Sequence, residues 1–289
     1  MHNKIKLCSF VEYSTGRDFL LQTFNLTKSQ IKKYKISKSF LNEKLFAKKE
    51  LELPINLVNH GKINPIYRGE IIHELLRTSS FICFNKPPKI HCHPLSYDEQ
   101  DNLISFVRMN YPISYLEINK EQYDRGLLFR LDYETSGLVV YSLNEELYQT
   151  ARKDLKSIIH EKKYMAIVHG TIEEEQSVRH YIKPYGEKGA SMVECQENDM
   201  RAFEINAKIK PIKSKNNKTL VEVIIKEGVR HQVRKHLELI GHPIIGDPLY
   251  SQNTHNQQMF LHCYQYTMYW NGHYFDLKAP VPDRFNQLV

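Results

Sequence analysis

The sequence lacks the long apolar runs that would place the chain in a membrane. None of its 289 residues lies in an apolar stretch that approaches the roughly 18 needed to cross a bilayer. Residues 1–13 also have no signal-peptide core. The five cysteines are odd in number and form no C-x-x-C pair, a usage typical of chains kept reduced. We therefore expect a cytoplasmic protein with no membrane partner.

The sequence also lacks a convincing metal or cofactor site. His91, Cys92 and His93 resemble metal ligands, but neighbours in an extended segment point to opposite faces and cannot easily share one ion. There is no glycine-rich phosphate-binding loop. A zinc nucleobase deaminase would need a P-C-x-x-C motif, which the chain does not contain. We expect no cofactor and no metal.

Acidic residues are fewer than basic ones, 33 against 40, which gives a net charge of +7 and a pI near 8.9. This charge alone indicates an anionic partner only weakly. It is accompanied by 18 tyrosines and 14 histidines, whose rings can stack on bases. The combination favours RNA. The length allows one large domain with a smaller appendage.

The most basic part of the chain lies between residues 15 and 50. Its apolar residues form only a patchy stripe, which predicts short helices. Two interpretations stay open, a lysine face exposed to solvent or a small module that contacts phosphates. The pattern loosens around Pro54 and Pro65, which indicates a connector. The lysines of this region are Lys28, Lys32, Lys33, Lys35, Lys38, Lys44, Lys48 and Lys49.

Apolar runs and turn signals predict the main elements after this connector. A helix is expected to begin with Asn144 as its N-cap and to continue to Ile158. Residues 171–218 are polar and are expected to form an irregular insertion that ends in a loop at 213–218. Strands are expected at residues 80–84, 138–141, 162–170 and 219–225.

One carboxylate, Asp132, stands next to a predicted core strand. The Arg-Leu-Asp segment at 130–132 is followed by a polar turn at 135–137 and by the apolar run at 138–141. An aspartate here can be a structural ion-pair partner or a turn cap. It can also be a reactive carboxylate at the edge of a cleft, because a rigid strand would hold it in place.

A second concentration of charge lies where the last predicted strand runs into a helix. Apolar spacing predicts this helix over residues 231–240, with its end at Gly241. Arg230 and Arg234 are four residues apart, which would place both on one side of the first turns. The free N–H groups of that turn add further donors, so we expect an anion to bind there.

Five separated segments, taken in order, resemble the motifs of the RluA class of pseudouridine synthases, which isomerise uridine to pseudouridine in rRNA or tRNA. The resemblance covers about residues 80–289. Two positions depart from the family pattern, Phe129 where histidine is common and Val233 where isoleucine is common. The segments are FICFNKPPKIHCHP, RLDYETSGLVVYS, KKYMAIVHG, GVRHQVRKHLELIGHPIIGDPLY and MFLHCYQYTMYW.

The resemblance implies roles for individual residues. Asp132 would be the catalytic carboxylate, Tyr164 would pack on the target base, and Arg234 would pair with Asp132. That pairing would keep Asp132 ionised, because an opposite charge within about 4–6 Å lowers a carboxylate pKa by about 1–3 units. Arg130 would fill the gap left by the extruded nucleotide. Further candidates for RNA contact are Arg230, His231 and Lys163.

The resemblance also implies an α+β fold, the pseudouridine-synthase fold, with a bent, mixed, mainly antiparallel sheet, flanking helices and a central cleft. We expect this catalytic domain over residues 76–289. Residues 1–75 would form a divergent basic accessory region, a candidate for RNA binding. The protein would act without a cofactor, as a monomer with no obligatory protein partner, on an RNA substrate. The alternative is an inactive RNA-binding protein of the same fold, against which the intact Asp132, Tyr164 and Arg234 argue.

Overall fold

The structure is a computed structural model that describes residues 4–288 except 10, 25, 27, 35, 55–56, 58–62, 65, 96–98, 121 and 252–257. Lys35 and Pro65, which entered the predictions above, lie outside the described residues. The chain divides into two compact units, Met1–Gly69 with His93–Arg125, and Glu70–Cys92 with Gly126–Val289. Among the described residues, no helix is long and apolar enough to span a bilayer.

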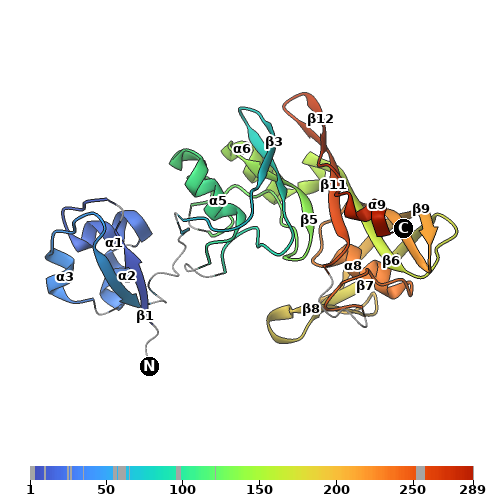
Figure 1. Cartoon of the computed structure of the whole chain (residues 1–289), viewed down its shortest axis with the longest axis horizontal. Helices are drawn as coiled ribbons and strands as arrows, with labels where there is room; N and C mark the ends of the chain where they lie inside the picture. Colours follow the sequence, from blue (N-terminus) through green and yellow to red (C-terminus); the bar gives the residue numbers. More distant parts are fainter. Residues whose placement is uncertain are drawn as a thin grey trace. The chain divides into compact units, whose positions relative to one another are not determined.

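The N-terminal module, residues 4–54, has an apolar core of its own. Phe19 and Leu20 are buried against Leu45 and Leu53, so the helices and strands of this small module share one core. The short helices predicted for the lysine-rich region are confirmed. The elements, blue in Figure 1, are β1 (Lys4–Cys8), α1 (Gly16–Phe24), α2 (Lys28–Lys33), α3 (Lys38–Asn42) and β2 (Glu50–Pro54), with β1 and β2 antiparallel.

The second segment of this unit contains α5 (Leu103–Asn110) and the 3-10 helix η1 (Ile113–Leu116). Asn102 caps α5, since its side-chain oxygen accepts a hydrogen bond of 2.9 Å from the Ser105 N–H. The Arg108 guanidinium donates to the carbonyl of Ile63. The helix is thereby tied to the chain segment that follows the N-terminal module.

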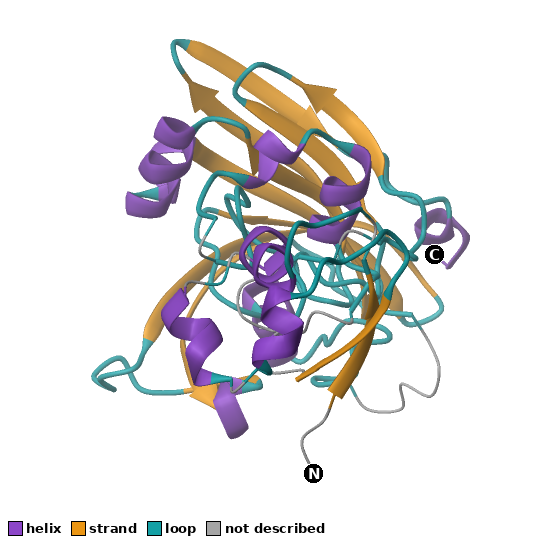
Figure 2. Ribbon diagram, turned by 90° about the vertical axis from the view of Figure 1, so that its left-hand side faces the viewer, coloured by secondary structure: helices purple, strands orange, loops and turns teal. Residues whose placement is uncertain are grey.

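The larger unit is built on one sheet of ten strands, drawn in orange in Figure 2. The β5–β11 contact is parallel and the other described pairs of this sheet are antiparallel. The predicted α+β class with a mixed, mainly antiparallel sheet is confirmed. The strand order is β3 (His73–Arg77), β4 (Phe81–Lys86), β5 (Ser136–Ser142), β11 (Leu261–Trp270), β6 (Ile159–His169), β10 (Lys218–Ile225), β9 (Phe203–Lys215), β7 (Gln176–Tyr185) and β8 (Ser191–Glu194), with β12 (His273–Lys278) beside β11.

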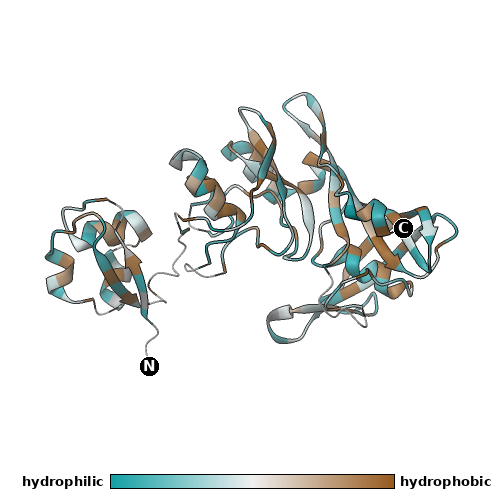
Figure 3. Ribbon diagram, in the orientation of Figure 1, coloured by the Kyte–Doolittle hydropathy of each residue, from teal (hydrophilic) through white to brown (hydrophobic). Residues whose placement is uncertain are grey.

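The central strands are the most apolar part of the sheet, as the brown segments in Figure 3 show. All residues of β5 are buried, and β4 is buried at every position except Asn85. Strands of this kind read as continuous apolar runs because both of their faces are covered. The strands predicted at residues 80–84, 138–141, 162–170 and 219–225 are confirmed as β4, β5, β6 and β10. The flanking helices are α6 (Glu145–Lys153), α7 (Leu155–Ile158), α8 (Gln232–Leu239) and α9 (Arg284–Leu288).

The predicted helix after Asn144 is two helices. Asn144 caps α6 as expected, with its side-chain oxygen 2.9 Å from the Leu147 nitrogen. The helix ends at Lys153, because Asp154 adopts an extended backbone and caps α7 through the Lys156 N–H. An aspartate that bonds to its own following turn favours a break of this kind over helix continuation.

The prediction of an irregular insertion at residues 171–218 is wrong, because most of this segment forms the strands β7, β8 and β9. In β9, buried Ile205 and Ile209 alternate with charged residues on the opposite face. This is the pattern of a strand with one face exposed to solvent. The many charged residues on that face make the strand hard to recognise in the sequence. The expected loop is a two-residue hairpin turn at Asn216-Asn217, where both residues have the positive φ of a type I′ turn.

Candidate active site

Asp132 lies in the loop that leads into β5. Its carbonyl accepts a hydrogen bond of 3.1 Å from the Thr135 N–H, which closes a turn, and its side chain is 27% exposed. The buried thiol of Cys92 contacts both the N–H and the carbonyl of Leu131, at 3.3 and 3.4 Å. Ser136, predicted as part of the turn, is already the first residue of the strand. The carboxylate is therefore held at a rigid strand entrance.

Arg234 connects Asp132 to a second, fully buried carboxylate. Its Nε and one terminal nitrogen donate to the two oxygens of Asp247 at 2.7 and 2.8 Å. The other terminal nitrogen donates to Asp132 at 3.0 Å. Burial alone lowers the pKa of Arg234, but the hydrogen bonds and charges of the two carboxylates outweigh this and raise it. The guanidinium stays charged and aims one N–H at Asp132.

The helix that carries Arg234 begins as predicted. α8 spans Gln232–Leu239 and ends before Gly241, whose φ of +83° closes it. The prediction that Arg230 and Arg234 share one side of its first turns is wrong, because Arg230 precedes the helix and is exposed whereas Arg234 is buried. The anions beside Arg234 are thus the chain's own carboxylates.

His231 lies between Asp132 and Tyr250. Its Nε2 is 3.8 Å from an Asp132 oxygen, and its Nδ1 is 2.9 Å from the Tyr250 hydroxyl. That hydroxyl accepts a hydrogen bond of 2.8 Å from the Met192 N–H, which favours donation of its own proton to Nδ1. Burial lowers the pKa of His231 to about 4. A neutral ring with its proton on Nε2 would therefore face Asp132 at neutral pH.

Tyr164 is a buried residue of β6, only 8% exposed, in register with Cys263 of β11 and Val223 of β10. Burial raises its pKa well above the usual value, and the nearby charge of Asp132 adds to the shift. The phenol is therefore neutral at physiological pH. It can donate a proton in a hydrogen bond, but it is not a phenolate.

The remaining predicted RNA contacts do not share one location. Arg130 and Arg230 are both exposed. Lys163 immediately precedes Tyr164 on β6, so its side chain points to the opposite face of the strand. There it lines a cavity of about 530 Å³ together with Arg179, Lys208 and Lys210. The structure brings together Asp132, Tyr164, His231 and Arg234, and it places Lys163 elsewhere.

Several residues of the site were not identified from the sequence. Asp247 and Tyr250 lie in the GDPLY part of one of the motifs given above. Their place in that motif was the feature of the sequence that could have identified them. Lys86 is fully buried and donates to the carbonyls of Pro87 and Ile90 at 2.8 and 3.0 Å. Burial lowers the pKa of Lys86 to about 8, although the electrostatic effect of the neighbouring Cys92 and Asp132 acts to raise it.

The His91-Cys92-His93 segment was set aside as a metal site, and its side chains have other contacts. The His91 ring lies 4.7 Å from the ring of Tyr133, and Cys92 contacts the backbone of Leu131. Among the residues that the structure describes, no group of three or more His, Cys, Asp or Glu side chains could hold a metal ion.

Comparisons with known proteins define the class. The family model described as RNA pseudouridylate synthase matches residues 80–239. An uncharacterized RNA pseudouridine synthase of Helicobacter pylori (strain ATCC 700392 / 26695) is 34% identical over 231 residues, which cover 79% of this chain and 81% of the relative. Another, from Helicobacter pylori strain J99, is 38% identical over 157 residues, 54% of this chain and 62% of the relative.

A solved structure, Human RNA Pseudouridylate Synthase Domain Containing 1, shares the fold with a TM-score of 0.58 at 20% identity, over 74% of this chain and 86% of that one. The fold is thus that of the pseudouridylate synthases. The chain belongs to the RNA pseudouridylate synthase family. It is an enzyme of the isomerase class that acts on RNA, and the resemblance read from the sequence is confirmed.

Proposed function

We propose that the protein converts specific uridines of structured rRNA or tRNA to pseudouridine, with Asp132 as the catalytic carboxylate. The observation that carries this proposal is the position of Asp132. It is the partly exposed member of a buried cluster, 27% exposed, and a guanidinium that is only 3% exposed orients it at 3.0 Å. A charge held this way is pre-organised for a reacting group that enters from outside.

The reaction breaks the N1–C1′ bond of uridine, rotates the base, and forms a C5–C1′ bond. C5 then loses its proton and N1 gains one, so the atoms balance without a co-reactant. Asp132 can take part by attack at C1′ or by removal of a ribose proton, and both routes need an ionised carboxylate. Arg234 serves either route by holding the Asp132 carboxylate in place through a hydrogen bond of 3.0 Å. The neutral phenol of Tyr164 would pack against the uracil and can donate a hydrogen bond to it.

The target base has to leave its stack before it can reach Asp132, at a cost of a few kcal/mol when it is paired. We propose that Arg130, exposed beside the catalytic loop, takes the place of the extruded nucleotide. Arg230 and His231 would contact the RNA near the target. Lys163, on the opposite face of β6, would contact only a more distant part of the same RNA.

We also propose that residues 76–289 form the catalytic domain. Residues 1–75 would form a basic accessory region that contacts RNA phosphates. The protein would act in the cytoplasm as a monomer. The runner-up is an inactive RNA-binding protein, and pseudouridine mapping separates the two. Comparison of rRNA and tRNA from cells with and without the protein should show one or more uridines that lose modification.

The direct test of Asp132 is its replacement by Asn. Asp132→Asn keeps the volume and an oxygen that can accept from Arg234, but it removes the charge and the nucleophile. We expect a folded protein that binds its RNA and releases no tritium from RNA labelled at uridine C5. The matched control is Glu134→Gln in the same loop, which should retain turnover. Tritium release by well-folded Asp132→Asn would refute the assignment of Asp132.

A further inference from the structure

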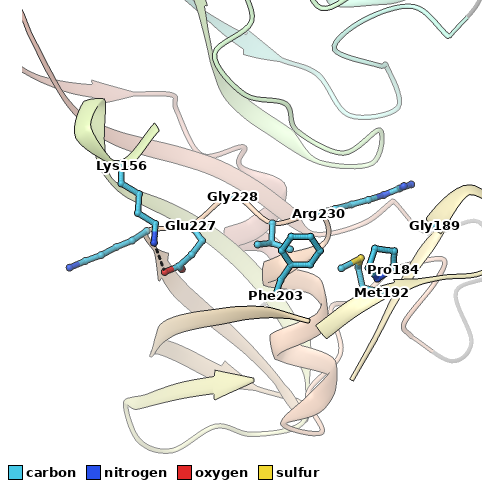
Figure 4. Close-up of a pocket in the computed structure, with 10 residues that line it drawn as sticks. Lys156, Pro184, Gly189, Met192, Phe203, Glu227, Gly228 and Arg230 are labelled. Carbon is cyan, nitrogen blue, oxygen red and sulfur yellow. Dashed lines mark hydrogen bonds and ion pairs between the residues drawn. The ribbon is translucent and has the colours of Figure 1, made fainter. Parts of the chain in front are cut away.

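A cavity of about 580 Å³ lies next to the start of α8, and of its lining residues Arg230 alone has been given a role above. Its volume falls within the roughly 300–1,000 Å³ of ligand-binding pockets. Figure 4 shows the Phe203 ring beside the Gly228–Arg230 segment, with Pro184 and Met192 on its other side. The Phe203 side chain is apolar, yet the residue is 47% exposed. An aromatic face is thus left open to solvent inside a pocket.

Basic side chains also line the pocket. Lys156, Lys226 and Arg230 line the pocket, and all three are exposed. One acidic residue, Glu227, also lines it, but its carboxylate is engaged by Lys156 at 3.4 Å and by Gln232 at 3.0 Å. Lys156 is itself paired by this contact, so the phosphate-binding role falls to Lys226 and Arg230. An exposed aromatic ring beside two cations matches a nucleobase that stacks on the ring while its phosphates meet Lys226 and Arg230.

The pocket is connected to the catalytic carboxylate by two hydrogen bonds and one close contact. The N–H of Met192, a lining residue, donates to the Tyr250 hydroxyl at 2.8 Å. The hydroxyl is 2.9 Å from His231 Nδ1, and His231 Nε2 is 3.8 Å from Asp132. Arg230, at the rim, precedes His231 in the chain. One chain of contacts through Tyr250 and His231 therefore joins the pocket to Asp132.

We propose that this pocket holds the base of the nucleotide directly next to the target uridine, on its 5′ or 3′ side. The inference rests on the proposed function, because it requires a uridine at Asp132. An unpaired neighbour that stacks on Phe203 would hold the RNA strand in register with Asp132. It would also select sites whose neighbouring base can leave the stack. The pocket is thus a determinant of which uridine is modified.

The test is a coupling measurement between Phe203 and the neighbouring base. The probe is a synthetic RNA that spans the uridine found by mapping, together with two copies that carry an abasic nucleotide on its 5′ or 3′ side. On the intact RNA, Phe203→Ala should lower kcat/KM by about 5- to 150-fold, the range for loss of one stacked base. On one of the two abasic RNAs, wild type should lose as much and Phe203→Ala should lose nothing further.

Three variants serve as controls. Phe203→Tyr keeps the ring and should keep activity, Phe203→Leu keeps bulk without the ring and should behave like Phe203→Ala, and Tyr274→Ala removes an exposed aromatic elsewhere without effect. Thermal melts of each variant verify folding. The inference is overturned if Phe203→Ala loses nothing, or loses the same factor on both abasic RNAs as on intact RNA. If wild type forms no pseudouridine on intact RNA, it is the proposed function that fails.

Discussion

At the scale of single residues, the site depends on how one guanidinium is shared. Asp247 takes two N–H groups of Arg234 in the bidentate geometry that suits arginine and carboxylate. This fixes the guanidinium plane, and a third N–H then points at Asp132. The buried Asp247 therefore fixes Arg234, and Asp132, which is 27% exposed, is the one of these two carboxylates that a substrate can reach.

We expect Arg234→Ala to destabilise the fold as well as to abolish turnover. The change would leave the Asp247 carboxylate, which is 0% exposed, with the N–H groups of Leu249 and Tyr250 as its remaining hydrogen-bond donors among the described residues. Loss of one member of a buried ion pair costs roughly 3–5 kcal/mol, whereas exposed positions change stability by about 0.5 kcal/mol or less. Denaturant unfolding of Arg234→Ala, with exposed Arg201→Ala as control, measures this difference.

The double variant Arg234→Ala/Asp247→Asn should recover part of the loss, because it also removes the stranded charge. Wild-type stability in Arg234→Ala would contradict the role of the buried pair. The planar shape of the guanidinium matters as well as its charge. Arg234→Lys keeps the charge, but an ammonium group cannot engage both carboxylates in the same way.

The sequence was informative for residues whose signal is local. Asp132 and Arg234 each stand in a short motif, and their pairing followed from the resemblance. The role of Asp247 depends on a contact that exists only after folding, so its position in the chain did not reveal it. Lys86 was missed for a similar reason. Nothing in the local sequence, a lysine followed by two prolines, indicates that its side chain is fully buried.

At the scale of elements, the parallel contact between β5 and β11 positions the catalytic loop. Gly137 of β5 pairs with Cys263 of β11 and has a φ of +118°, which L side chains rarely adopt. A Cβ at this position would lie 2.0 Å from the carbonyl oxygen of Cys263. The close approach of the two strands therefore requires glycine here, five residues after Asp132.

We expect Gly137→Ala to cost roughly 2–6 kcal/mol, from backbone strain together with overlap against β11, and to lower turnover by displacing the catalytic loop. The matched control is Gly272→Ala, since Gly272 has a φ of +78° and nothing within 4 Å of an added Cβ. That variant should lose only the strain, about 1–2 kcal/mol. Chemical unfolding of both proteins tests the difference, and equal losses would contradict the close-approach argument.

The same scale shows which elements a sequence can reveal. The strands β4, β5, β6 and β10 were predicted because their apolar runs are long and bounded by turn residues. The three strands at 176–215 were not, because their exposed face is rich in lysine and glutamate and their inward residues are few. A one-sided strand at the edge of a sheet gives a weaker signal than a buried central one.

At the scale of the whole molecule, the question is where the net charge of +7 lies and whether it can contact RNA. Part of the lysine-rich region is neutralised within the N-terminal module, where Lys44 and Lys49 pair with Glu12 and Glu43. Lys28, Lys32 and Lys38 lie on the helices of this module and are exposed. Helix positions that leave cations open to solvent suit contacts with phosphates.

Neutralising Lys28, Lys32 and Lys38 together should weaken RNA binding most at low salt. If these residues contact phosphates, each lost contact reduces the slope of log affinity against log salt by roughly 0.7–0.9. The measurement is a set of binding titrations with the mapped RNA at several salt concentrations. The control with the same charge change in the same module is Lys4→Gln/Lys44→Gln/Lys49→Gln, since these lysines already pair with glutamates. An unchanged slope in the first variant, or an equal change in both, would mean that the lysines form only a solvated face. We expect a shallower slope in the first variant alone, because counterions are released only where a phosphate takes their place.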